Sequence, residues 1–310
     1  MSRILITGAE GFTGHYLAAA LHARGHEVHG LVQCESPTVR DTRSASLQQT
    51  HVCDLLDPIG LSRVVNAVRP DKVAHLAGIA FVGHGDVEAI YRVNVVGTRH
   101  LLAALASSGA PLTAVLLASS AHVYGNVYGN VYGNVAGGEL DESVALAPAN
   151  DYAVSKLAME YVARTWREHL PITIVRPFNY TGIGQSEDYL LPKIVAHFRR
   201  RAPLIELGNL DVERDFSDVR TVVEVYCRLL ERQAAHEVLN VCSGRGQSLR
   251  GVFELVSEMA GYRPEVRMNP AFVRANEVLR LVGSKAALER CIGPVAGPSI
   301  GETLAWMFNA

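Results

Sequence analysis

The 310-residue sequence has few cysteines, little net charge and no long apolar run. The five cysteines are Cys34, Cys53, Cys227, Cys242 and Cys291. They lack the paired spacing of a metal site, and we expect reduced thiols without zinc or disulfides. A net charge of −2 offers no basic surface for nucleic acid. Because the chain starts without a charged-then-apolar leader and has no bilayer-spanning run, we expect a cytoplasmic protein with no membrane partner.

The chain has 48% apolar residues, enough for a large core. Apolar strands alternate with amphipathic helices up to about residue 178, which predicts an α/β fold with a doubly wound parallel sheet. The predicted strands start near Arg3, Glu27, Gln49, Lys72, Thr113 and Ile172. Later signals predict a helix over Leu191–Arg200, a short strand over Leu204–Leu207, and helices beginning near Val219 and Ser248. We therefore expect an α/β domain over 1–178 and a smaller lobe over 179–310.

A glycine-rich turn follows the first predicted strand and precedes a helical run. Gly8, Gly11 and Gly14 form the pattern Gly-x-x-Gly-x-x-Gly. Glycines let the backbone turn tightly and approach a pyrophosphate, which the first amides of the helix can bind. A turn without a ligand is the alternative, but strand, glycines and helix stand in the order that a dinucleotide site requires.

Tyr152 and Lys156 stand four residues apart, so a helix would place them on one face. A phenol has a pKa of about 10, and a neighbouring cation lowers it, which makes a usable acid or base. An isolated pair of this kind is more often a core aromatic beside a solvated lysine. The glycine turn and the hydroxyl of Ser120, at the end of the fifth predicted strand, favour the catalytic interpretation.

Together these motifs resemble the extended short-chain dehydrogenase/reductase superfamily, which includes nucleotide-sugar epimerases, dehydratases and 4-keto reductases. Further matches are Asp54 with Leu55, the segment His75-Leu76-Ala77-Gly78, Asn94, and Ala118–Gly125. The resemblance implies an NAD(P)-binding Rossmann domain over 1–178 and, over 179–310, mainly a nucleotide-sugar substrate lobe from which segments can return to the sheet. It implies that Ser120, Tyr152 and Lys156 are catalytic. It also implies cofactor contacts from Gly8, Gly11, Phe12, Gly14, Asp54, Leu55, Leu76, Ala77, Gly78, Tyr152 and Lys156.

Three later segments are similar to those of GDP-4-keto-6-deoxy-D-mannose reductases that form GDP-D-rhamnose. They are Ile172–Asn179, Arg214–Asp218 and Val238–Gly244. The resemblance implies that Asn179, Arg214 and, on a looser match, Arg280 bind the nucleotide diphosphate. An arginine suits two-point contact with phosphate oxygens. Considered without the family, Arg214 beside Asp215 is equally consistent with a surface ion pair.

Two departures from the family pattern concern the reaction and the cofactor. Dehydratases of the superfamily carry an Asp-Glu pair directly after the strand-five hydroxyl, where this chain has Ala121 and His122. Dehydration is therefore not expected, and His122 is either a sugar contact or a structural histidine. No carboxylate stands near Val32, where NAD-selective members bind the ribose. Because Arg40 and Arg43 follow, NADP(H) is favoured over NAD(H), unless both are solvated loop charges.

One feature has no counterpart in the family. The tetrapeptide Tyr-Gly-Asn-Val occurs three times over residues 124–135. Replication slippage into a tolerant loop is the favoured origin, since exposed loops accept insertions at small entropic cost. The alternative is that the added tyrosines reshape the sugar pocket.

The sequence thus predicts an NAD(P)H-dependent reductase of the 4-keto group of a GDP-activated 6-deoxyhexose, with a nucleotide sugar as its substrate. The alternatives are a nucleotide-sugar 4-epimerase, a reductase of dTDP-linked keto sugars and, remotely, a nonenzymatic NADP-sensing protein. The base of the nucleotide and the C4 stereochemistry stay open at this point. Helices over about 86–108 and 152–168 correspond to those that relatives pair into a four-helix bundle, so we expect a homodimer.

Overall fold

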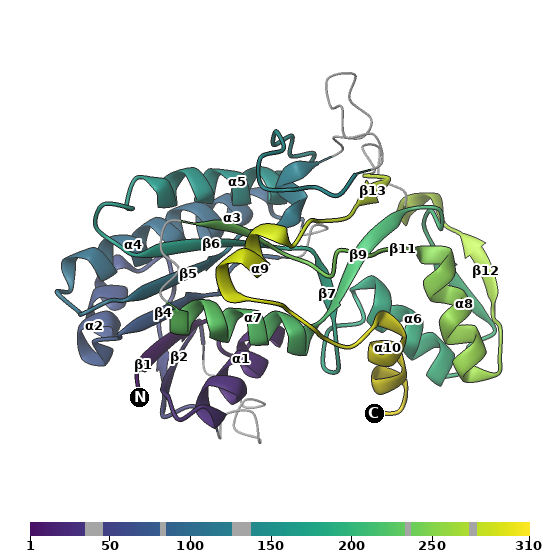
Figure 1. Ribbon diagram of the computed structural model, residues 1–310, viewed down its shortest axis with the longest axis horizontal. Coiled ribbons are helices and arrows are strands. Elements are labelled where there is room, and N and C mark those ends of the chain that lie inside the picture. Colours follow the sequence, from purple (N-terminus) through teal and green to yellow (C-terminus); the bar gives the residue numbers. More distant parts are fainter. Residues whose placement is uncertain (35–45, 81–84, 126–137, 233–236, 273–277) are drawn as a thin grey trace. The chain divides into compact units, whose positions relative to one another are not determined.

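The computed structural model describes residues 1–34, 46–80, 85–125, 138–232, 237–272 and 278–310. The chain forms two compact units (Figure 1). The first unit comprises Met1–Val123, Pro148–Arg176 and Val223–Leu239. The second comprises Tyr124–Ala147, Pro177–Val222 and Asn240–Ala310. Both units are therefore assembled from separate stretches of the chain.

The first unit is built on a seven-stranded sheet with the order β10-β6-β5-β4-β1-β2-β3. The strands are β1 (Arg3–Thr7), β2 (Glu27–Val32), β3 (Gln49–Val52), β4 (Lys72–His75), β5 (Ala114–Ala118), β6 (Ile172–Pro177) and β10 (Val238–Val241). The neighbours from β3 through β6 run parallel. The strand order reverses between β1 and β4, so the doubly wound fold predicted from the sequence is confirmed. Ligands of such sheets bind at this reversal, outside the carboxyl ends of the strands.

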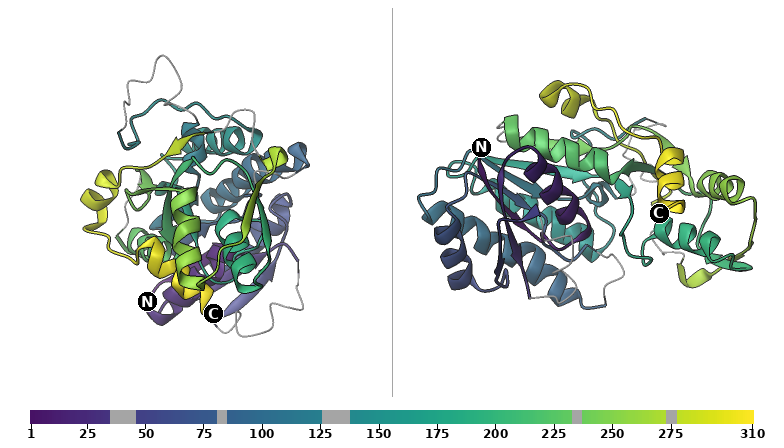
Figure 2. Two further views of the ribbon diagram at one scale, coloured as in Figure 1. Left: turned by 90° about the vertical axis from the view of Figure 1, so that its right-hand side faces the viewer. Right: turned by 90° about the horizontal axis from the view of Figure 1, so that it is seen from below.

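Helices cover both faces of this sheet. The helices α2 (Pro58–Val68), α4 (Thr98–Ser107) and α5 (Asp151–Arg164) pack their apolar residues against the strands in one core cluster. The helix α1 (Phe12–Ala23) buries Leu17, Ala18 and Leu21 on the opposite face (Figure 1). In the right-hand view of Figure 2, α1 lies in front of the strands. The last part of α7 (Val219–Arg232) is joined to α1 by ion pairs of Arg24 with Glu224 and Glu231.

The helix predicted over 86–108 is not one regular helix. It consists of α3 (Val87–Tyr91), a π-helical segment η3 (Arg92–Gly97) and α4. Single π turns inside helices widen the backbone and are frequent at functional sites. Here the wide turn carries the buried side chain of Asn94. The other predicted helix, 152–168, ends earlier, because α5 stops at Arg164.

The second unit contains a small sheet with the order β11-β9-β13, and β7 also pairs with β9. These strands are β7 (Asn179–Thr181), β9 (Glu213–Asp218), β11 (Gly246–Ser248) and β13 (Arg280–Leu281). A second pair joins β8 (Leu204–Leu207) to β12 (Glu265–Met268). The helices are α6 (Leu190–Arg199), α8 (Leu249–Ala260), α9 (Ala286–Ile292) and α10 (Ile300–Phe308). Apolar residues of α6, α8 and α10 form the core of this unit with β8 and β9.

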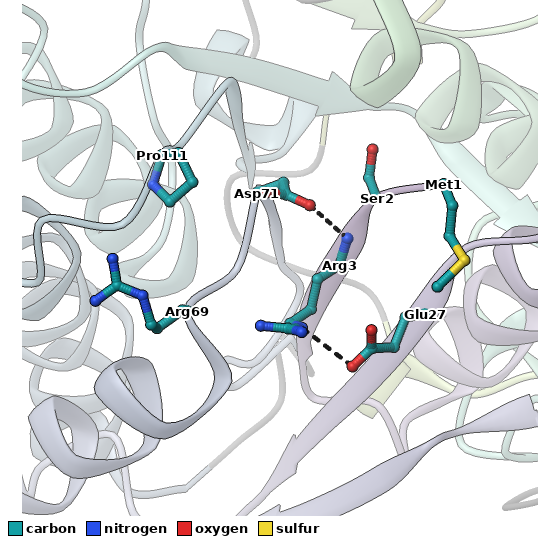
Figure 3. A pocket seen from close by; sticks show the side chains of 7 residues that line it. All are labelled: Met1, Ser2, Arg3, Glu27, Arg69, Asp71 and Pro111. Atoms are coloured by element: carbon teal, nitrogen blue, oxygen red, sulfur yellow. Dashed lines mark hydrogen bonds and ion pairs between the residues drawn. The ribbon is translucent and has the colours of Figure 1, made fainter.

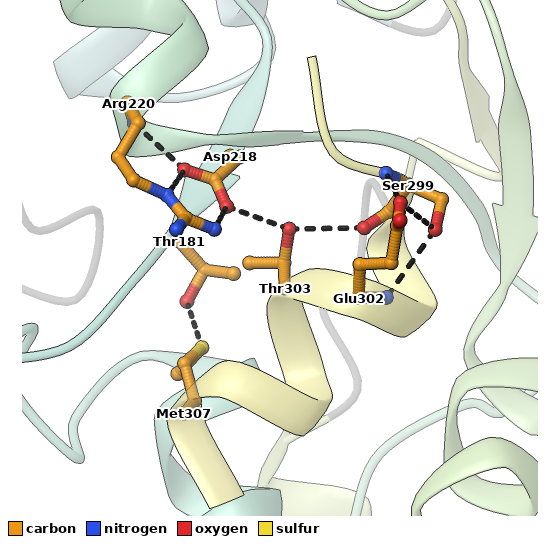
Figure 4. Close-up of polar contacts among 7 residues, drawn as sticks. All are labelled: Thr181, Asp218, Arg220, Ser299, Glu302, Thr303 and Met307. Carbon is orange, nitrogen blue, oxygen red and sulfur yellow. Dashed lines mark hydrogen bonds and ion pairs between the residues drawn. The ribbon is translucent and has the colours of Figure 1, made fainter. Parts of the chain in front are cut away.

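Polar contacts fix the end of β9 to α10 (Figure 4). Asp218 is fully buried, accepts two hydrogen bonds from the side chain of Arg220, and accepts another from Thr303 at 2.8 Å. Ser299 and Glu302 form a capping box that starts α10. The arrangement satisfies a buried carboxylate and holds the last helix in register.

Within the described ranges, no helix combines the length and the apolar character that crossing a membrane requires. The same residues contain no group of three or more His, Cys, Asp or Glu side chains arranged to hold a metal ion.

Candidate active site

One cavity of the structure lies at the amino-terminal end of the sheet. It has a volume of about 370 Å³ and is lined by Met1, Ser2, Arg3, Glu27, Arg69, Asp71 and Pro111 (Figure 3). Several of its polar groups bond within the lining, since the side chain of Arg3 donates to Glu27 at 3.0 Å and Asp71 accepts from the backbone amide of Arg3 at 2.7 Å. A doubly wound sheet binds its ligands at the opposite, carboxyl end. The candidate site therefore lies at the carboxyl end of the sheet.

The glycine turn between β1 and α1 has the tight geometry that a pyrophosphate loop needs. Gly8 has φ +70°, and a Cβ on it would lie 2.8 Å from the Ala77 amide nitrogen. A Cβ on Gly14 would lie 2.1 Å from the Gly8 carbonyl oxygen. The helix begins at Phe12, after Gly11, which as N-cap supplies no side-chain hydrogen bond. The amino end of α1 can thus come close to an anion, as the pattern predicts.

A buried hydrogen-bonded chain joins β1, β4 and the helix behind them. The hydroxyl of Thr7 lies 2.7 Å from Nδ1 of His75, and Nε2 of His75 lies 2.9 Å from the hydroxyl of Thr98. Burial lowers the pKa of His75 to about 3, so the ring is neutral. Thr98 in turn donates to the carbonyl of Asn94 at 2.7 Å. This chain fixes the segment Leu76–Gly78, although the sequence analysis gave His75 no role.

Asn94 supports the same segment with its side chain. Its Oδ1 accepts from the Ile79 amide at 2.8 Å, and its Nδ2 donates to the Ile79 carbonyl and to the Ser155 hydroxyl, both at 3.0 Å. A Cβ on Gly78 would lie 2.8 Å from Oδ1 of Asn94 and 3.4 Å from Nζ of Lys156. Glycine at this position therefore lets the loop after β4 approach Lys156 on α5.

Asp54 follows β3, where the resemblance places the adenine contact. Its Oδ1 accepts from the Leu56 amide at 2.8 Å, and its Oδ2 accepts from the side chain of Gln33 at 3.2 Å. A cavity of about 310 Å³ adjoins these residues and is lined by Gln33, Leu56, Asp86, Glu88, Ala89, Arg92 and Val93. Gln33 and Arg92 were not among the site residues predicted from the sequence. Arg40 and Arg43, predicted near a 2′-phosphate, lie outside the described residues.

Ser120, Tyr152 and Lys156 all lie in the first unit. Asn150 caps α5 by accepting from the Ala153 amide at 2.9 Å, so Tyr152 and Lys156 stand on successive turns, each 8% exposed. Ser120 follows β5, is 4% exposed, and accepts from the His122 amide at 3.2 Å. That bond uses a lone pair of the hydroxyl oxygen, so its hydrogen can be donated to a substrate. The His122 ring meets the Tyr152 ring edge-on at a centroid distance of 5.9 Å.

Burial lowers the pKa of Lys156 to about 8, and the charge of Glu160 partly opposes this shift. The ammonium donates to the Ala118 carbonyl at 2.9 Å. A buried lysine with a pKa near neutrality has the chemistry of an active site rather than of a solvated surface residue. The interpretation of Lys156 as a solvated lysine is therefore wrong.

The residues predicted to bind substrate lie in the second unit. Asn179 is on β7, and its buried Oδ1 has no hydrogen-bond partner within the part of the chain that the structure describes. Arg214 donates to the carbonyls of Glu213 at 2.9 Å and Leu279 at 3.3 Å. Arg280 pairs with the Glu213 carboxylate at 2.9 Å. Both arginines thus gather beside Glu213.

Asp215 is not a surface partner for Arg214. It is fully buried and accepts from the amide and hydroxyl of Ser243 and from the Gly244 amide. Burial raises the pKa of its carboxyl group. The alternative of a surface ion pair is thereby removed, and Asp215 serves to fix the loop after β10.

The sequence model of the NAD dependent epimerase/dehydratase family matches residues 4–242. The chain belongs to this family. Its resemblance to the extended short-chain dehydrogenase/reductases, noted from the motifs, is confirmed, and the family is NAD(P)-dependent. The matched range contains the glycine turn and the residues Ser120, Tyr152 and Lys156.

Two curated relatives cover nearly the whole chain. GDP-6-deoxy-D-talose 4-dehydrogenase of Aggregatibacter actinomycetemcomitans is 33% identical, over 94% of this chain and 91% of its own. GDP-6-deoxy-D-mannose reductase of Pseudomonas aeruginosa is 35% identical, with the same coverage of 94% and 91%.

Two solved structures are also similar. A candidate epimerase from Burkholderia cenocepacia has 49% identity and a TM-score of 0.90, over 99% of this chain and 97% of its own. RMD from Pseudomonas aeruginosa, solved with NADPH, has 31% identity and a TM-score of 0.82, over 100% and 98%.

Proposed function

We propose that this protein is an NADP(H)-dependent reductase of the 4-keto group of a GDP-linked 6-deoxyhexose. The observation that carries the proposal is the group formed by Ser120, Tyr152 and Lys156, three buried polar side chains at the carboxyl end of β5 and on the first turns of α5. They are the donors that a developing oxyanion requires. The two curated relatives are named for oxidation or reduction of GDP-linked 6-deoxyhexoses, which supports this substrate class.

The fit of a dinucleotide rests on the geometry of the first unit. Gly8 and Gly14 stand where a Cβ would collide with backbone atoms, as expected where the chain turns tightly beneath a pyrophosphate. The amino end of α1 would hold the pyrophosphate, and Asp54 with Leu55 would hold the adenine. When bound, the reduced nicotinamide supplies the hydride. NADP(H) is favoured because Gln33, an amide, follows β2 in place of a carboxylate, and a similar structure binds NADPH.

Side chains of this protein supply the proton and stabilise the charge that develops on the oxygen. Reduction of a ketone places negative charge on its oxygen, and Tyr152 gives its phenolic proton to that oxygen. Ser120 donates a hydrogen bond to the same atom. Lys156, as an ammonium, stabilises the phenolate that Tyr152 becomes and binds the nicotinamide ribose. The two buried donors raise the rate because they favour the charged oxygen over the neutral carbonyl.

Substrate recognition is assigned to the second unit. The side-chain amide of Asn179 has a buried Oδ1 with no described partner, so this oxygen can accept a hydrogen bond from a ligand. Arg214 and Arg280 would contact the diphosphate. For Arg280 this contact must compete with its ion pair to Glu213. We therefore assign the larger share of diphosphate binding to Arg214, and we retain His122 as a sugar contact beside Tyr152.

The absence of an acid/base pair after Ser120 argues against dehydration. Ala121 is completely buried, and His122 presents its ring to Tyr152. Removing water across two sugar carbons needs a carboxylate pair at these positions, which an apolar methyl and one imidazole do not supply. Reduction needs neither group.

We also propose a homodimer formed through α3 to α5. Four large apolar side chains are exposed on these elements: Val87, Val96, Val154 and Tyr161. Exposed apolar patches often mark protein interfaces. Substituting Val154 with Glu should convert the dimer to a monomer in light scattering after gel filtration, whereas Met268→Glu, at an exposed site of the second unit, should not. A wild-type monomer would refute this proposal.

The function is tested by the loss of reduced-nicotinamide absorbance when the protein meets GDP-4-keto-6-deoxy-D-mannose. Rapid oxidation of NADPH, slower with NADH, is expected. No oxidation with either cofactor would overturn the reductase. Tightly bound oxidised NAD in the purified protein would then indicate a 4-epimerase, and oxidation only with dTDP-linked keto sugars would indicate a different nucleotide.

A further inference from the structure

A completely buried ion pair lies directly behind the catalytic residues. Glu160, on α5, is 0% exposed, and Arg176, on β6, is 2% exposed. Nε of Arg176 donates to Oε1 of Glu160 at 2.9 Å, and Nη2 donates to Oε2 at 2.7 Å. Buried ion pairs are costly to desolvate and are weak contributors to stability, so an arrangement of this kind calls for another explanation.

Glu160 has a third partner that connects it to the active site. The hydroxyl of Ser119 donates to Oε1 of Glu160 at 2.6 Å. Ser119 lies between Ala118, whose carbonyl accepts from Lys156, and Ser120, the proposed donor to the substrate carbonyl. Its amide also donates to the Val175 carbonyl at 2.8 Å, next to Arg176. The strand end that carries both catalytic contacts is thus attached to α5 through one carboxylate.

Glu160 also acts on Lys156 by its charge. It stands one helical turn after Lys156, and it is the group whose charge raises the pKa of Lys156 against the effect of burial. His75 on β4, which is neutral at physiological pH, and Tyr152 on the same helix also lie near Lys156. Arg176 is the opposing charge, and its guanidinium is directed to the carboxylate of Glu160.

We propose that Glu160, fixed by Arg176, is a positioning residue of the active site. Through Ser119 it sets the position of the Ala118 carbonyl and the Ser120 hydroxyl, and by its charge it keeps Lys156 an ammonium ion. The kinetic part of this inference rests on the proposed reductase, whereas the charge part can be measured without any substrate.

The charge part is tested by titrating Lys156 directly. The chain has only four lysines, Lys72, Lys156, Lys193 and Lys285, so carbon-13 labelling of lysine gives a small NMR spectrum in which Lys156→Met identifies the signal. In Glu160→Gln the midpoint of Lys156 should fall by roughly half a pH unit or more. If that variant does not fold, the double variant Glu160→Gln/Arg176→Met removes both charges together. The titration midpoint of Lys156 should still fall in the double variant, but by less than in Glu160→Gln alone. An unchanged midpoint in a folded variant would overturn the proposal.

The positional part is tested with Ser119→Ala, which keeps both charges. Its kcat for ketone reduction should fall roughly five- to tenfold, which is the effect of one misplaced hydrogen bond. The Kd of NADPH should stay within about twofold of the wild-type value, and the titration midpoint of Lys156 should be unchanged. Ser257→Ala is the matched control, because it removes a buried hydroxyl that donates only to the Phe253 carbonyl in the second unit. A wild-type kcat in Ser119→Ala, or an equal loss in the control, would contradict the proposal. If the wild type reduces no ketone, the proposed reaction fails, and the Lys156 titration still decides the role of Glu160.

Discussion

The ammonium of Lys156 donates a hydrogen bond to the Ala118 carbonyl at 2.9 Å, which joins helix α5 to the end of strand β5. Lys156 stands one helical turn after Tyr152 on α5, and the bond to Ala118 holds it close to the segment that carries Ser120. A single lysine thus both orders the site and supplies its positive charge.

Replacing Tyr152 with Phe removes the proton donor and keeps the ring. We expect kcat to fall by about 10²–10⁴-fold, the usual contribution of a positioned general acid, with NADPH affinity nearly unchanged. Steady-state kinetics and a fluorescence titration with NADPH measure the two quantities. Tyr226→Phe, in the buried part of α7, is the matched control. Turnover retained in Tyr152→Phe would remove Tyr152 from the mechanism.

The pH dependence of kcat should have a basic limb set by Lys156. Its pKa is lowered to about 8, so Lys156 is a cation below this pH and loses its charge as the pH rises through it. Activity should therefore decline above about pH 8, because a neutral lysine no longer stabilises the phenolate of Tyr152. A pH profile of kcat at saturating substrate measures the limb. A plateau extending to pH 10 would be inconsistent with a lysine buried at the active site.

Gly8→Ala and Gly25→Ala separate backbone strain from steric conflict. Both glycines have positive φ, +70° and +79°, but a Cβ on Gly8 meets the Ala77 backbone at 2.8 Å, whereas a Cβ on Gly25 meets nothing within 4 Å. Gly25→Ala should cost about 1 kcal/mol of unfolding free energy and leave NADPH binding intact. Gly8→Ala should cost more and weaken NADPH binding at least tenfold. Calorimetry and a binding titration give both values, and equal effects of the two substitutions would argue against a nucleotide site at this turn.

Deleting two of the three Tyr-Gly-Asn-Val copies should leave KM and kcat unchanged. Most of the repeat lies outside the described residues, but Tyr124 is completely buried and donates to Oδ1 of Asn240 at 2.8 Å. Tyr124, the first residue of the repeat, is therefore part of the core of the second unit, and the deletion should remove residues 128–135. A changed KM would instead support a role of the added tyrosines in the sugar pocket.

The fold class could be predicted from the sequence because the sheet has strong local signals. Five of the six predicted strand starts match those of the structure, and the sixth is one residue early, since β5 begins at Ala114 rather than Thr113. The edge strand β10 was not assigned to this sheet. β10 pairs with β6, which is far from it in the sequence. The alternation of strands and helices does not indicate that a later strand comes back to this sheet.

The proposed catalytic side chains could be selected from the sequence, but the contacts that support them in the structure could not. Tyr152 and Lys156 can be recognised by their four-residue spacing, which is a local property of the sequence. The contact of Ser119 with Glu160 spans 41 residues, and that of Thr7 with His75 spans 68. The π-helical turn at Asn94 is likewise set by tertiary contacts, because a regular helix over 86–108 satisfies the same apolar pattern.

The central claim, reduction at C4 of the sugar, is tested most directly by isotope transfer. The protein is given GDP-4-keto-6-deoxy-D-mannose with NADPH that carries deuterium at nicotinamide C4, in separate reactions for its two faces, and the product is examined by NMR. We predict that one of the two cofactors delivers its deuterium to C4 of the 6-deoxyhexose, with one cofactor oxidised per sugar. A product without deuterium at C4 from both cofactors, or conversion without net cofactor oxidation, would contradict the account.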